Sequence, residues 1–75
     1  MDYREWGREY LREARMLKRH LAPLRPQLKT LTGEDKILLL NRIAMLTEMY
    51  LECLRTGQEL LKKGDFFEAR SKFKS

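Results

Sequence analysis

Two stripes of mostly apolar residues mirror each other across a Thr-Gly turn at residues 32 and 33. Each stripe steps by alternating threes and fours, the spacing that places residues on one face of an α-helix. The stripe in the first half comprises Tyr3, Gly7, Tyr10, Ala14, Leu17, Leu21, Leu24 and Leu28. The stripe in the second half comprises Leu39, Ile43, Leu46, Tyr50, Cys53, Gly57, Leu60 and Gly64.

The two stripes pair one to one when the chain folds back at the turn. Leu28 then faces Leu39, and large residues meet small ones toward the open end, where Tyr10 faces Gly57 and Gly7 faces Leu60. Unequal side chains that face each other fill a core without gaps. We therefore predict an all-α fold built on an antiparallel two-helix hairpin.

The capping residues and prolines set the expected helix boundaries within a single helical domain, residues 1–75. The first helix is expected at about 2–31, with Asp2 as its N-cap. Pro23 and Pro26 each lack an amide donor, so we expect a kink or a break at 23–26, with a short helix following if the helix breaks.

The second helix is expected at about 33–63. Gly64 favours a left-handed stop there. Asp65 with Glu68 three residues later is typical of a new helix start, which predicts a short C-terminal helix at about 65–73.

A second apolar stripe runs along the second helix, beside the first. A helix that is apolar over most of its circumference is buried on more than one side. The stripe is self-complementary when it runs antiparallel to itself, so we expect a homodimer that forms a four-helix bundle. The alternative is a monomer in which the C-terminal segment folds back over this stripe. The expected dimer interface is Ile37, Leu40, Ala44, Thr47, Leu51, Leu54 and Leu61.

A strip of five arginines on the first helix is the candidate binding surface for a polyanion. The formal net charge of +5 permits such a partner. Glutamates stand three residues before two of these arginines, which favours the alternative of a solvated salt-bridge face. The strip comprises Arg4, Arg8, Arg12, Arg15 and Arg19.

No residue pattern points to catalysis or to a metal or cofactor. His20 stands alone, and Cys53 falls on the apolar stripe as a small hydrophobe. Glutamates 48, 52 and 59 lack the Glu-x-x-His spacing of metal sites in helix bundles. We expect a protein that is not an enzyme and binds no cofactor. A single cysteine and the lack of a signal peptide or transmembrane segment predict a cytoplasmic setting.

Two stretches carry resemblances to known families. The stretch "KKGDFFEARSKF", residues 62–73, resembles half of a tetratricopeptide repeat in its glycine, alanine and aromatic positions. The stretches "YREWGREYLREARMLKRHL" and "RIAMLTEMYLECLRTGQELL" resemble short α-helical proteins of Gram-positive bacteria that have no assigned activity. This second resemblance implies a small all-α fold in a bacterial cytoplasm.

The excess apolar surface predicts a protein-interaction or scaffold module that acts through self-association and possesses no chemistry of its own. The alternative is a nucleic-acid-binding regulator that uses the arginine strip of the first helix. A peptide that lies on a membrane surface fits less well, since the first helix lacks a bulky apolar face opposite a uniformly basic one.

Overall fold

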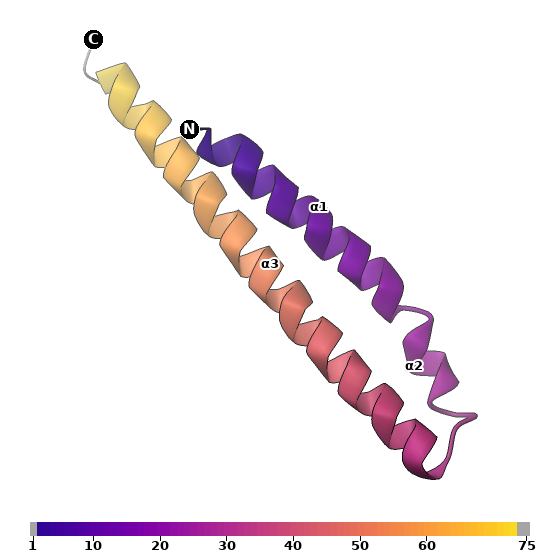
Figure 1. The fold of residues 1–75 in the computed structure, drawn as a ribbon. Coiled ribbons are helices and arrows are strands. Elements are labelled where there is room, and N and C mark those ends of the chain that lie inside the picture. The colour runs from indigo at the N-terminus through magenta and orange to yellow at the C-terminus, as the bar shows by residue number, and fades with distance from the viewer. Residues whose placement is uncertain (1, 74–75) are drawn as a thin grey trace.

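A computed structural model of the chain shows two long helices packed antiparallel as a hairpin (Figure 1). The structure describes the backbone of residues 2–73 and the side chains of residues 2–68. Within that part, α1 spans Tyr3–Leu21, α2 spans Leu24–Gln27 and α3 spans Gly33–Phe73. The prediction of an all-α antiparallel hairpin is confirmed.

The first helix begins at the expected cap and ends just before the first proline. The Asp2 carboxylate accepts hydrogen bonds from the backbone N–H groups of Arg4, at 3.0 Å, and Glu5, at 3.3 Å. These bonds satisfy amides that have no partner inside the helix. At the other end α1 stops at Leu21, because Pro23 cannot donate a backbone hydrogen bond to the preceding turn.

The chain resumes as one short helical turn before it reverses direction. In α2 the side-chain amide of Gln27 donates to the carbonyl of Pro23, at 3.1 Å. The prolines therefore produce a break followed by a short helix, which is one of the two expected outcomes. Gly33 then opens α3 with a φ of +63°, a left-handed conformation that glycine adopts at little cost.

The two predicted stripes form the contact between α1 and α3. Every member of both stripes is buried or half-buried. Among residues 2–68 no large side chain is completely enclosed, because two helices alone cannot surround it. The hydrophobic core is consequently narrow. Its best-buried side chains are Ala14, Leu17, Leu21 and Leu60.

Two glycines bring the helix backbones into direct contact near the open end. A Cβ atom built on Gly7 would lie 2.8 Å from the carbonyl oxygen of Gly57, and one built on Gly57 would lie 3.0 Å from that of Gly7. The same Cβ on Gly57 would lie 2.9 Å from Leu11 side-chain atoms. Gly57 therefore faces Leu11 and Gly7, and the prediction that Tyr10 faces it was wrong in detail. In packed helices a side chain of one helix inserts between residues of the other helix, so a one-to-one pairing does not hold.

The predicted helix end at Gly64 was also wrong. The helix α3 continues through Gly64, which lacks a positive φ, so the segment from Asp65 is the last part of α3 and not a separate short helix. Gly64 serves close packing instead, since a Cβ there would lie 2.6 Å from Cγ and 3.2 Å from the backbone nitrogen of Arg4. The side chains of residues 69–73, the last part of that predicted helix, lie outside the described side chains.

The unbroken α3 makes the molecule a rod of 64 × 16 × 15 Å. Figure 1 shows α3 continuing past the N-terminal end of α1. The C-terminal segment stays in line with α3 and does not fold back over it, so the three-helix monomer considered from the sequence is not the observed fold. One side of α3 is left without a covering helix.

Replacing Gly7 with alanine should destabilise the hairpin. An alanine inside a helix normally gains about 1 kcal/mol over glycine. Here the added methyl group would press on the backbone of α3, and overpacking of this kind costs about 1–3 kcal/mol. We expect a net loss in the free energy of unfolding and a lower Tm in thermal denaturation at fixed protein concentration. Arg8→Ala, next to it and exposed, should change stability by less than about 0.5 kcal/mol. A rise in Tm for Gly7→Ala would contradict the close contact.

Candidate functional site

The residues that the sequence singled out for chemistry do not come together. His20 is exposed on α1. Cys53 has a free thiol and is half-buried on the side of α3 that packs against α1. Within the described residues, no three side chains of histidine, cysteine, aspartate or glutamate cluster as metal ligands would. No helix in that part of the chain has an apolar stretch that could cross a bilayer. The surfaces that remain as candidates are apolar or basic.

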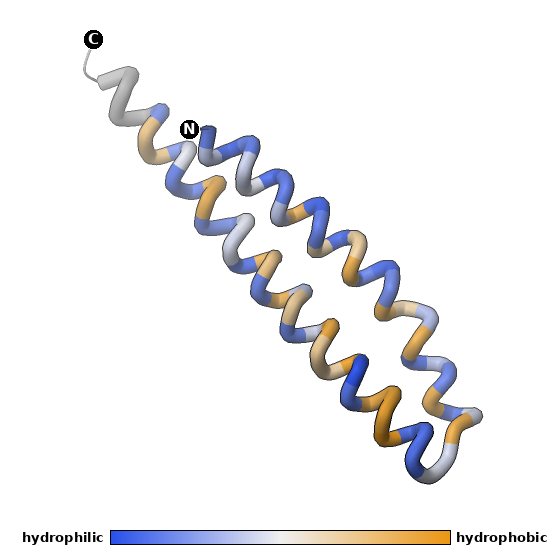
Figure 2. The backbone as a smooth tube through the Cα atoms, in the orientation of Figure 1, coloured by the Kyte–Doolittle hydropathy of each residue, from blue (hydrophilic) through white to orange (hydrophobic). Residues whose placement is uncertain are grey.

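One of these surfaces is the second apolar stripe of α3. Three of its large side chains stay strongly exposed: Ile37 at 58%, Leu40 at 45% and Leu51 at 48%. Ala44 between them is exposed as well, and Thr47 is half-buried. We call these five residues the α3 face. Figure 2 shows the apolar residues of α3 concentrated in the half of the helix nearest the turn.

The remaining two interface candidates lie partly inside the hairpin. Leu54 and Leu61 are half-buried. Leu61 sits against α1, since a Cβ on Gly7 would lie 3.1 Å from its Cγ atom. Leu61 therefore already contributes to the contact between α1 and α3.

Three of the five candidate arginines line one shallow groove. Arg8, Arg12 and Arg15 surround Leu11 along a hollow of about 290 Å³, and no carboxylate lines it. Among the side chains of residues 2–68, both ion pairs within 4 Å involve Arg4, so the salt bridges expected between neighbouring glutamates and arginines of α1 are not formed. The groove is basic and open to solvent.

Arg4 is separated from this groove by its contacts with α3. Its Nη2 atom lies 2.7 Å from Oδ1 of Asp65 and also pairs with the carboxylate of Glu68. Its aliphatic stem packs against Gly64. Arg4 therefore joins the two helices at the open end, a role the sequence reasoning missed because it assigned Asp65 and Glu68 to a separate helix.

An aromatic cluster covers the other side of the open end. The ring of Tyr3 stacks on Phe67, with centroids 5.6 Å apart, and lies 6.5 Å from that of Trp6. Trp6 and Tyr10 line a shallow hollow together with Glu9 and Glu13. The two sides of α1 thus differ in charge, with arginines on one side and glutamates beside aromatic rings on the other.

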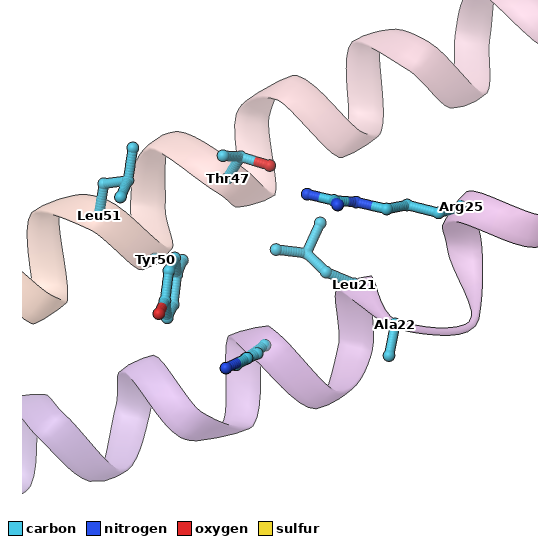
Figure 3. A pocket seen from close by; sticks show the side chains of 7 residues that line it. Leu21, Ala22, Arg25, Thr47, Tyr50 and Leu51 are labelled. Atoms are coloured by element: carbon cyan, nitrogen blue, oxygen red, sulfur yellow. The ribbon is translucent and has the colours of Figure 1, made fainter.

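A deeper cavity lies where the prolines interrupt the first helix. Its volume is about 420 Å³. Figure 3 shows that it opens between the end of α1, the start of α2 and the middle of α3. Pro23 marks the place where the two helical segments separate, but no local residue pattern predicts a cavity there. The lining residues are Lys18, Leu21, Ala22, Arg25, Thr47, Tyr50 and Leu51.

No family model, curated protein or solved structure matches this chain. Both resemblances noted in the sequence therefore stay predictions, and function has to be inferred from the surfaces themselves.

Replacing Arg4 with methionine should destabilise the protein, whereas the same change at Arg8 should not. Methionine keeps much of the aliphatic stem but removes the charge that pairs with Asp65 and Glu68. Solvent-exposed ion pairs contribute up to about 1 kcal/mol each, so we expect a loss of about 1 kcal/mol in urea unfolding. Equal stabilities for the two variants would show that the Arg4 ion pairs contribute nothing.

Proposed function

We propose that this protein is a small non-enzymatic helical module that acts through self-association. The α3 faces of two copies pack antiparallel, and the resulting dimer is a four-helix bundle with the two α3 helices at its centre. The observation that carries the proposal is the exposure of Ile37, Leu40, Ala44 and Leu51 along one side of α3; within the α3 face only Thr47 is half-buried. Soluble monomers rarely leave such a row of apolar side chains in water.

The total surface of the chain supports this proposal. A compact monomer of 9.0 kDa would expose about 4,900 Å². The hairpin exposes 6361 Å², an excess of roughly 1,500 Å². A stable protein–protein interface of standard size removes about 800 Å² from each partner. The excess is therefore large enough for each copy to bury such an area.

The spacing along α3 fits an antiparallel copy of itself. Leu51 of one copy faces Thr47 of the other, and Ala44 faces Leu54, so large and small side chains meet across the twofold axis. Ile37 faces Leu61 toward the ends, where Leu61 is already partly covered by α1. The centre of the interface, at Thr47 and Leu51, consequently contributes the most new contact.

A charge at the centre of the α3 face should separate the dimer. We expect Leu51→Asp to sediment as a monomer, because dimerisation would bury an unpaired carboxylate. At protein concentrations at which the wild-type protein is dimeric, the apparent free energy of unfolding of the variant should be lower by several kcal/mol. Met45→Asp is the matched control, since Met45 is 57% exposed but lies on another side of α3, and this variant should remain a dimer. Wild-type protein that stays at 9.0 kDa at high micromolar concentration would refute self-association.

Binding of nucleic acid is the second candidate function, and the arginine groove favours it. Among the side chains of residues 2–68, no carboxylate pairs with Arg8, Arg12 or Arg15, and the three arginines face solvent together. Arginine forms planar, bidentate contacts with phosphate. Arg4 is excluded from this candidate site because Asp65 and Glu68 already occupy its guanidinium group.

If the groove binds nucleic acid, affinity should fall steeply with salt. The expected log–log slope is roughly −0.9 per phosphate contact on duplex DNA and about −0.7 on single strands. Replacing Arg8, Arg12 and Arg15 with glutamine should weaken binding and flatten the slope in filter-binding or anisotropy titrations.

The control for this experiment removes the same number of charges from α3, by replacing Lys36, Arg42 and Arg55 with glutamine. This control variant lowers the net charge by the same amount as the groove variant. Binding that depends on the groove should therefore be weakened less in the control variant than in the groove variant. Equal losses in the two triple variants would indicate attraction by net charge alone. Retention of neither DNA nor RNA at low salt would remove this second candidate.

A further inference from the structure

The cavity at the proline break combines an apolar floor with a cationic rim. Leu21 is 6% exposed and forms the floor, and the ring of Tyr50 and the side chain of Leu51 form walls. Figure 3 shows Arg25 extending from α2 toward Thr47, with Leu21 pointing into the space between α1 and α3. Lys18 lies on the α1 side of the same opening.

The charges around this opening are all of one sign. Lys18 and Arg25 contribute two cations, and no aspartate or glutamate lines the cavity. The Thr47 hydroxyl donates to the carbonyl of Ile43, at 2.7 Å, and its oxygen can still accept a hydrogen bond. An occupant that matches both parts of the cavity must therefore carry a negative group at one end and an apolar body at the other.

We propose that this cavity binds a small amphipathic carboxylate, such as a free medium-chain fatty acid. The carboxylate lies between the ammonium group of Lys18 and the guanidinium group of Arg25, whose planar donors suit a carboxylate. The alkyl chain covers Leu21 and packs along Tyr50 and Leu51. The cavity volume of about 420 Å³ falls within the range of small-molecule pockets, about 300–1,000 Å³.

Other ligand classes match only half of the cavity. Inorganic phosphate would pair with the cations but leave the apolar floor in contact with water. A neutral hydrocarbon or alcohol would cover the floor but gain nothing from Lys18 and Arg25. The arginine groove, lined by Arg8, Arg12 and Arg15, is a separate surface and shares no residue with this cavity.

The site does not depend on the proposed dimer, because all of its lining residues come from one chain. Thr47 and Leu51 nevertheless also form the centre of the proposed interface, so a ligand in the cavity and a second copy of the chain would compete for these two residues. Binding and association state are therefore measured separately, by titration and by sedimentation. Failure of one proposal leaves the other open to its own test.

The binding test is a two-dimensional NMR titration of the full chain with octanoate, hexanoate and octan-1-ol. Octanoate should cause saturable shifts in the amides of Leu21, Ala22 and Thr47. Each methylene that enters the apolar part should tighten binding about fourfold, so octanoate should bind roughly 15-fold more tightly than hexanoate. Octan-1-ol should bind more weakly than octanoate, since it cannot pair with the cations.

Charge-removing variants at the rim test the assigned orientation. Lys18→Gln and Arg25→Gln should each weaken octanoate binding about threefold and leave binding of octan-1-ol unchanged. Both residues are exposed, so the fold should be retained, which circular dichroism can verify. Arg12→Gln is the matched control and should have no effect.

Three outcomes would overturn the proposal. The first is octanoate shifts that do not saturate, or that fall in the hollow around Trp6 and Tyr10. The second is equal affinity for octanoate and octan-1-ol. The third is an Arg12→Gln variant that weakens octanoate as much as Arg25→Gln does.

Discussion

The contact between the backbones of Gly7 and Gly57 sets the geometry on which the rest of the hairpin depends. Without side chains at this crossing, α1 and α3 approach closely enough for Leu11 and Leu61 to pack beside the glycines. The same proximity allows Arg4 to reach Asp65 and Glu68 one turn further along. A hairpin with so few buried side chains relies strongly on close packing, since dispersion contacts are lost when helices separate even slightly.

The features predictable from the sequence were those governed by helical periodicity and by local hydrogen bonding. The mirrored stripes gave the correct buried faces, because a face of an α-helix follows directly from residue spacing. Asp2 and Pro23 marked a helix start and a helix end, because a cap and a missing donor act within one turn.

The features that could not be predicted depend on contacts between residues distant in sequence. Gly64 looks like a helix stop on its own, and its packing role is visible only from the position of Arg4 on the opposite helix. The cavity between Lys18 and Tyr50 was missed for the same reason. Its walls come from three helices, and no local pattern records how far a proline break separates them.

The hairpin is closed by a covalent turn at one end only, at Gly33, and this has a consequence for how it opens. The contacts of Tyr3 and Arg4 with the far end of α3 close the longest loops, so they gain least from chain connectivity and are the ones most easily lost. Separation of the helices should thus proceed like the opening of a zipper, from the ion pairs of Arg4 inward. The segments around α2, held by the nearby turn, would be the last to separate. A protease would therefore cleave first in the open ends of α1 and α3.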